Sequence, residues 1–155
     1  MPNCARQRRC LSLCFIVMSF CTLACDADDW PMWRHDSGRT GTTPARMPDS
    51  LELKWERQLP EITPAFHSPR LQFDAGYEPI VAEGLCLIAS SLTDSVTAYD
   101  AETGREIWTF RTNGPVRFAP AVSNGSVCFG SDDGYLYCVE LHTGKLRWKH
   151  RAVPS

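Results

Sequence analysis

The segment that decides the fold is Ala98-Tyr-Asp-Ala-Glu-Thr-Gly-Arg-Glu-Ile-Trp108, which recurs 40 residues later as Cys138-Val-Glu-Leu-His-Thr-Gly-Lys-Leu-Arg-Trp148. Both copies place a Thr-Gly pair four residues before a tryptophan. A period of about 40 residues is typical of one four-stranded blade of a β-propeller. A single blade cannot bury its own apolar face and needs neighbours on both sides. We therefore predict part of a propeller, with function in surfaces that several blades build together.

The sequence around the two copies repeats as well. Residues 79–90 align with residues 120–131, and each copy continues with a polar turn (residues 92–94 or 132–134), a returning strand and the Thr-Gly turn. No segment shows a sustained helical period. Residues 51–59 alternate apolar and polar residues, which predicts a strand with one buried face that carries Trp55 as the counterpart of Trp108 and Trp148. Residues 51–155 are thus predicted to form two near-complete four-stranded antiparallel blades plus part of a third, an all-β chain.

Two segments without a strand pattern interrupt this plan. Residues 28–50 hold several Gly and Pro residues, which predicts an irregular N-terminal arm pinned by Trp30 and Trp33. Residues 60–76 predict a loop that makes the unit from Trp55 to Trp108 longer than the period. Such an insertion is either tolerated without a role or emerges as a loop on the binding rim of the propeller.

The N-terminus has the pattern of an export signal. Arg6, Arg8 and Arg9 precede an apolar run from Leu11 to Cys25, and cleavage after Ala27 fits the small residues there. Residues 1–27 are therefore predicted to be a signal peptide of a periplasmic or cell-envelope protein. Three alternatives stay open, namely an uncut membrane anchor, a lipid on Cys25 and a twin-arginine signal.

Charge and cysteine usage narrow the function classes. Beyond residue 27 the chain has 13 basic and 17 acidic residues, so it lacks the basic balance of a nucleic-acid-binding protein. Of the eight cysteines only Cys86, Cys128 and Cys138 lie beyond the leader. Export implies an oxidising compartment in which thiols can pair, but an odd count leaves at least one unpaired or intermolecular.

The repeated residues have structural roles in this interpretation. Gly104 and Gly144 fit a position with positive φ after a type I turn. Thr103 and Thr143 can close that turn, and Asp100 can accept hydrogen bonds from its N–H groups, with Glu140 in the second copy. A buried indole covers roughly 200 Å². We expect each tryptophan to lie between adjoining sheets, seated by the glycine four places earlier.

The pattern Ala-x-Asp-x-x-Thr-Gly-x-x-x-Trp, complete from Ala98 to Trp108, resembles the tryptophan-docking motif of PQQ-like propeller repeats. The second copy departs from it at Cys138 and Glu140. The opening Asp29-Trp-Pro-Met-Trp-Arg34 is similar to the start of exported bacterial members. The resemblance implies either a quinoprotein dehydrogenase that holds pyrroloquinoline quinone and calcium, or a non-catalytic scaffold such as the lipoprotein that assists assembly of outer-membrane barrels.

No residue pattern predicts a catalytic or metal site. The chain lacks the adjacent Cys-Cys of quinone-binding members and a Cys-x-x-Cys-His heme motif. The acidic turn Asp132-Asp133-Gly134 favours a hairpin over a calcium site. If Gly134 is left-handed in that hairpin, Cys128 faces Cys138 at a distance that permits a cross-strand disulfide; the alternative is two small core residues.

The sequence thus favours a non-catalytic, exported scaffold that binds protein partners or the remaining blades. It predicts no cofactor and no nucleic acid, and leaves membrane attachment through the N-terminus possible. The alternatives are a fragment of a PQQ-dependent alcohol or sugar dehydrogenase, with calcium, and a sensor domain. A closed propeller needs at least four blades, so we expect an incomplete propeller that exposes blade faces and self-associates.

Overall fold

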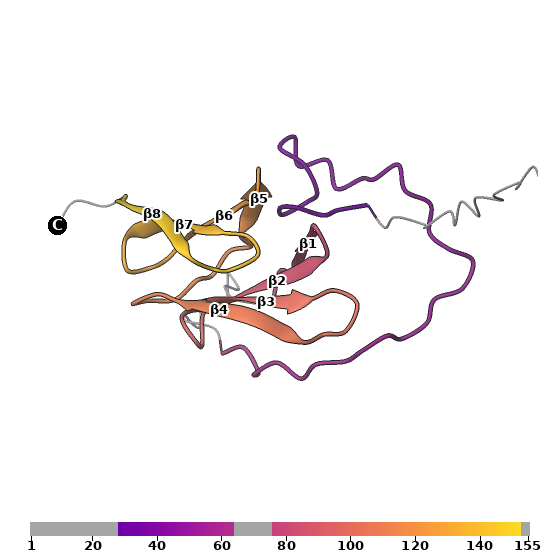
Figure 1. Ribbon diagram of the computed structural model, residues 1–155, viewed down its shortest axis with the longest axis horizontal. Coiled ribbons are helices and arrows are strands. Elements are labelled where there is room, and N and C mark those ends of the chain that lie inside the picture. The colour runs from indigo at the N-terminus through magenta and orange to yellow at the C-terminus, as the bar shows by residue number, and fades with distance from the viewer. Residues whose placement is uncertain (1–27, 64–75, 153–155) are drawn as a thin grey trace, which may run out of the picture.

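The computed structural model describes residues 28–63 and 76–152, and these residues contain strands and turns but no helix. The predicted signal peptide of residues 1–27 and the lipidation site at Cys25 lie outside the described residues. Two four-stranded antiparallel sheets form the body (Figure 1). Each sheet follows the chain order of its strands, so the all-β partial propeller predicted from the sequence is confirmed.

The strands of the two sheets correspond one to one. The first sheet holds β1 (Ile80–Ala82), β2 (Leu85–Ser90), β3 (Ser95–Asp100) and β4 (Glu106–Arg111). The second sheet holds β5 (Ala121–Ser123), β6 (Ser126–Gly130), β7 (Tyr135–Glu140) and β8 (Leu146–Arg151). Both sheets have a register shift at the same point, after Ala98 in the first and after Cys138 in the second.

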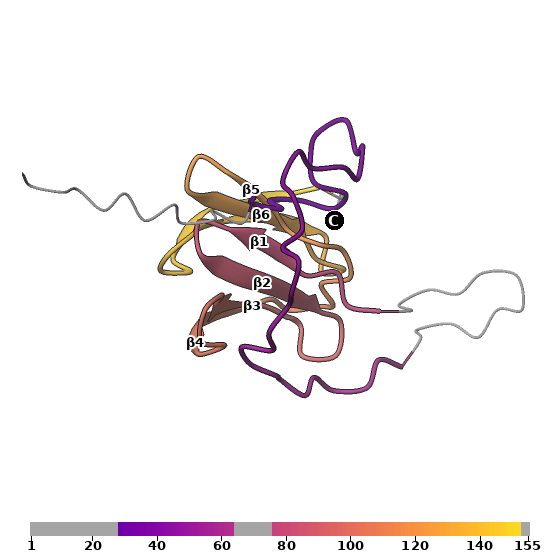
Figure 2. The ribbon, with the colours of Figure 1, turned by 90° about the vertical axis from the view of Figure 1, so that its right-hand side faces the viewer.

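The core lies between the two sheets, which stack face to face (Figures 1 and 2). The first sheet contributes Leu87, Val96, Ala98 and Trp108, and the second contributes Val127, Phe129, Tyr137 and Val139, all of them buried. The Phe110 ring contacts those of Phe129 and Tyr137 at centroid distances of 5.8 and 5.5 Å. Each sheet therefore buries an apolar face only because the other is present, as the repeat period requires.

Residues 51–59 differ from the prediction because they form no strand. Leu51 and Leu53, which should have lined a buried face, are 74% and 81% exposed. The segment runs along the outside of the first sheet (Figure 1). An alternating sequence becomes a strand only when a neighbouring strand takes up its backbone hydrogen bonds, and no strand among the described residues does so.

The N-terminal arm closes the inner edges of both sheets. Trp30 and Val81 exchange two backbone hydrogen bonds of 2.7 and 3.0 Å, and Val122 N donates to Pro31 O at 2.8 Å. Figure 2 shows this part of the chain passing beside β1. Backbone pairing at Trp30 holds the arm, whereas the Trp33 side chain is 44% exposed and lies against Arg34 and Arg39 of the arm itself. A paired edge strand is protected from adding a foreign strand.

Candidate functional site

The joint between the two sheets is built around Trp108. This side chain is 8% exposed, and its indole Nε1 donates to the carbonyl of Leu141 at 2.8 Å. The ring lies directly over Gly144, where an added Cβ would be 2.7 Å from Trp108 Cδ2. Only a residue without a side chain lets the indole come this close, so the Thr-Gly turn of the second sheet acts as the seat for the tryptophan of the first.

Trp55 makes the same contacts with the first sheet. Its Nε1 donates to Ala101 O at 2.9 Å, and a Cβ at Gly104 would lie 2.6 Å from its ring. Each seated indole therefore covers the glycine of the following repeat, not the glycine four residues earlier as the sequence suggested. The ring projects from the face of its own sheet, whereas the turn that precedes it lies at the end of that sheet.

Trp148 occupies the corresponding position on β8 but is 46% exposed. Within the part of the chain that the structure describes, no Thr-Gly turn lies against it. Trp108 thus lies between two sheets, as the sequence predicts. Trp148 does not, because no second sheet among the described residues covers it.

Hydrogen bonds to an acidic side chain hold each Thr-Gly turn in shape. Asp100 Oδ1 accepts from Thr103 N at 2.8 Å and from Thr103 Oγ1 at 2.7 Å, and Glu140 Oε2 accepts from Thr143 N at 2.7 Å. The bond with Thr103 lowers the pKa of Asp100, and that with Thr143 lowers the pKa of Glu140. Gly104 and Gly144 follow with φ of 69° and 66°, in the left-handed region that favours glycine.

The acidic turn between β6 and β7 binds the connection that joins the two sheets. Asp133 Oδ2 accepts from the Tyr137 hydroxyl at 2.6 Å and from Asn113 N, in the connection from β4 to β5, at 3.2 Å. Asp132 pairs with Arg117 of the same connection at 2.6 Å. Burial raises the pKa of Asp133, but its hydrogen bonds outweigh this effect and the pKa is lowered. Burial and the bond to Asp133 raise the pKa of Tyr137 to about 12.

Cys128 and Cys138 lie directly opposite each other in the β6–β7 ladder and are free thiols in the structure. Burial, with the neighbouring Cys138, raises the pKa of Cys128 to about 11. A thiol with so high a pKa is a poor nucleophile at neutral pH. The cross-strand disulfide stays a prediction, and thiol titration of the unfolded, unreduced chain tests it: three free thiols in the mature form would exclude the bond.

Two larger pockets open on the described surface, one on the first sheet and one beside the N-terminal arm. The larger, of about 500 Å³, lies on the face turned away from the second sheet and is lined mainly by hydroxyl-bearing and charged side chains, including Ser95, Thr97, Thr109, Glu106 and Arg111. The smaller, of about 460 Å³, lies beside the N-terminal arm and is lined by Trp33, Arg39, Glu78, Phe118 and Ala119.

Three of the contacts that sequence reasoning missed involve backbone groups. The carbonyls of Ala101 and Leu141 accept the indole hydrogen bonds, and a carbonyl acceptor leaves no trace in residue type. Their signal is positional, because each carbonyl belongs to the residue just after the acidic residue of the turn. The connection that meets Asp133 was missed for the same reason, since Asn113 donates through its backbone N–H.

Two properties of the described residues bear on wider roles. No set of three or more His, Cys, Asp or Glu side chains is grouped there as metal ligands would be. The same residues include no helix with the length and apolar character needed to cross a membrane.

Comparisons with known proteins agree with this architecture. A family model described as outer membrane protein assembly factor BamB matches residues 23–155. The chain is 31% identical over 87 residues to the dehydrogenase subunit of a quinone alcohol dehydrogenase from Gluconacetobacter polyoxogenes, covering 49% of this chain and 12% of that protein. It is 27% identical over 165 residues to a 1-butanol dehydrogenase (cytochrome c) from Thauera butanivorans, covering 95% of this chain and 22% of that protein.

Among solved structures, quinohemoprotein alcohol dehydrogenase from Comamonas testosteroni is similar, with a TM-score of 0.57 and 24% identity over 80% of this chain and 19% of that one. This likeness shows the fold alone. The chain spans about a tenth to a fifth of the length of the curated relatives it matches. The match of the family model over residues 23–155, together with the repeated blade in the structure, shows that the chain belongs to the PQQ-like β-propeller repeat family.

Proposed function

We propose that this chain is a non-catalytic repeat module of an exported propeller and serves as a binding or assembly scaffold. The observation that carries the proposal is that the acidic residues of the repeats bind groups of the chain itself. Asp100, Glu140 and Asp133 direct their carboxylates to N–H and O–H groups of the chain itself. Residues engaged in this way stabilise the turns and the packing of the two sheets. We infer that the surface of these packed sheets binds another protein.

Two observations support an exported scaffold. The family model that matches most of the chain is described as an outer membrane protein assembly factor. The basic and apolar pattern of residues 1–27 has the features of an export signal. We accordingly propose a periplasmic or envelope location, with protein partners or further blades as the binding partners and Cys25 as a possible point of lipid attachment.

The second candidate function is a portion of a quinone-dependent alcohol dehydrogenase, which the names of the matched relatives favour. Against this candidate, the acidic side chains of the repeats already have partners within the chain. The densest acidic spot of the repeats, Asp132-Asp133, makes its contacts with Arg117, Asn113 and Tyr137 of the chain itself. Calcium would need six to eight oxygen ligands, and these carboxylates would have to leave their present partners to supply any.

Titration of the chain with pyrroloquinoline quinone and calcium tests the proposal. Tryptophan fluorescence reports binding, and dye reduction with an alcohol substrate reports turnover; a quinoprotein alcohol dehydrogenase stripped of its cofactor is the positive control. We expect neither saturable quenching nor dye reduction. Binding in the micromolar range or tighter, lost when calcium is chelated, would contradict the scaffold proposal and favour the dehydrogenase alternative.

A further inference from the structure

The outer face of the second sheet has no partner among the described residues. It repeats the face of the first sheet that is buried in the core, because Cys128, Cys138 and Trp148 occupy the positions of Leu87, Ala98 and Trp108. On this outer face Leu136 and Trp148 are 38% and 46% exposed. The second sheet therefore presents the same kind of face that the first sheet uses to hold its neighbour.

The matching seat is the Thr-Gly turn of the first sheet. Its Gly104 lies under the ring of Trp55. The segment that carries Trp55 forms no strand, and Leu53 of that segment is 81% exposed. Next to this turn lies the cavity of about 500 Å³, on the same face of the first sheet. The equivalent face of the second sheet is covered by the whole first sheet. Among the described residues, a single extended segment covers this face of the first sheet, where a whole sheet would fit.

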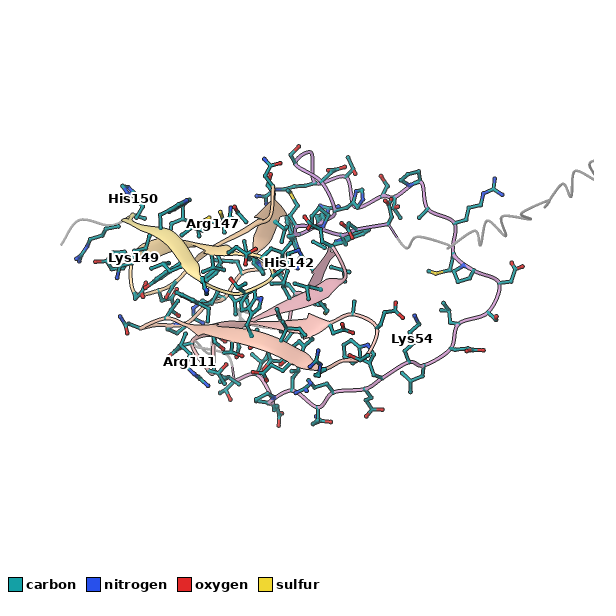
Figure 3. The ribbon with its side chains drawn as sticks, in the orientation of Figure 1. Lys54, Arg111, His142, Arg147, Lys149 and His150 are labelled. Atoms are coloured by element: carbon teal, nitrogen blue, oxygen red, sulfur yellow. The ribbon has the colours of Figure 1, made fainter. Side chains whose placement is uncertain are left out.

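The two tryptophan segments carry the same local sequence. Leu53-Lys54-Trp55 and Leu146-Arg147-Trp148 both read leucine, a basic residue and tryptophan. Lys54 forms an ion pair with Glu102 in the turn that seats Trp55. Arg147 on β8 stands at the corresponding place and now donates to Ser126 Oγ at 2.5 Å. Figure 3 shows Lys54 beside the turn that joins β3 to β4, and Arg147 on β8 in the other sheet.

From this correspondence we propose that the chain binds a second copy of itself head to tail. Trp148 of one copy displaces Trp55 from Gly104 of the next, donates to the Ala101 carbonyl, and brings Arg147 to Glu102. The joint that already exists between the two sheets of one chain supplies the geometry. Head-to-tail contacts close into rings when the rotation permits.

The test measures the mass of the chain, as its host produces it, by sedimentation over a hundredfold concentration range. We expect reversible association that Trp148→Ala weakens at least about tenfold, as removal of a central interface tryptophan does. Trp33→Ala is the matched control, because Trp33 is 44% exposed and belongs to the arm; it should leave association within about twofold of wild type. Trp55→Ala should strengthen association, because it empties the seat.

A charge exchange keeps the proposal testable if a tryptophan variant folds poorly. Glu102→Lys should weaken association, and adding Arg147→Glu should restore it, with circular dichroism confirming that each variant keeps its strands. A wild-type chain that stays monomeric over the whole range would overturn the proposal. So would association that Trp148→Ala and Glu102→Lys leave unchanged. The mass measurement involves no quinone, so its outcome is independent of the test of the scaffold function.

Discussion

The Trp108 joint and the Trp55 joint make the same contacts in different surroundings. In both, an indole donates to a carbonyl at 2.8 or 2.9 Å and lies over a glycine. Trp108 stands on a four-stranded sheet and is 8% exposed. Trp55 stands on a segment without strand structure, where Leu51 is 74% exposed. The seat therefore recognises a single tryptophan, whereas deep burial of that tryptophan requires the sheet behind it.

Removal of each indole is expected to separate these two contributions most clearly. Trp108→Ala leaves a large cavity between the sheets and should lower the free energy of unfolding by about 3–5 kcal/mol. Trp55→Ala removes a part-exposed ring and should cost about 1–2 kcal/mol. Urea unfolding followed by circular dichroism measures both, with Trp148→Ala as the control that costs roughly 0.5 kcal/mol or less. Equal losses for Trp108 and Trp55 would mean that the sheet adds nothing to the seat.

Substitution of the glycines that lie under the indoles compares the same two joints. Gly144→Ala combines strain at positive φ with overlap against Trp108 and should cost about 2–5 kcal/mol. Gly84→Ala is the control for strain alone, because φ there is 77° and no atom lies within 4 Å of the added Cβ, so about 1–2 kcal/mol is expected.

Gly104→Ala distinguishes the two joints. The segment that carries Trp55 pairs with no described strand, so we expect it to yield more easily than a sheet. The free-energy cost of Gly104→Ala should then approach that of Gly84→Ala, with greater exposure of Trp55 to a fluorescence quencher. A loss as large as that of Gly144→Ala would show that the Trp55 segment is held as firmly as a sheet.

Acid should weaken the two Thr-Gly turns. We expect this change in stability to be the smallest of those predicted. The pKa of Asp100 is lowered from 3.8 in the folded protein, chiefly by Thr103. The unfolded chain therefore takes up the proton first, so the stability that this carboxylate provides is present above about pH 4 and is lost as pH falls through the lower folded value. Glu140, whose ordinary pKa is 4.5, follows the same sign.

Melting temperatures measured from pH 5 down to pH 2 test this prediction. Asp100→Asn and Glu140→Gln should each show a smaller decrease than wild type over that interval, because the neutral amide cannot lose a charge. Asp49→Asn, an exposed position outside the turns, should follow wild type. A decrease in Asp100→Asn as steep as in wild type would show that other carboxyl groups cause the acid sensitivity.

The repeat predicted the strands of the two sheets because blade formation depends on local features. Polar turns, alternating strands and the glycine corner are visible in the residues of one repeat. The same reasoning was wrong over residues 51–59, where the alternation is present but no described strand lies alongside to pair with it. It also assigned each tryptophan to its own glycine, since distance along the chain does not reveal which sheet a side chain faces.

By itself, the sequence determined the period, the all-β class, the turn residues Thr103, Gly104, Thr143 and Gly144, and the family that these residues resemble. The tertiary structure alone decided that Trp108 lies over Gly144 and donates to the Leu141 carbonyl. It also decided that the carboxylate of Asp133 binds the connection that joins the two sheets. The physical reason is that turns and strands follow from neighbouring residues, whereas these contacts arise only once two sheets have packed and their backbone groups have met.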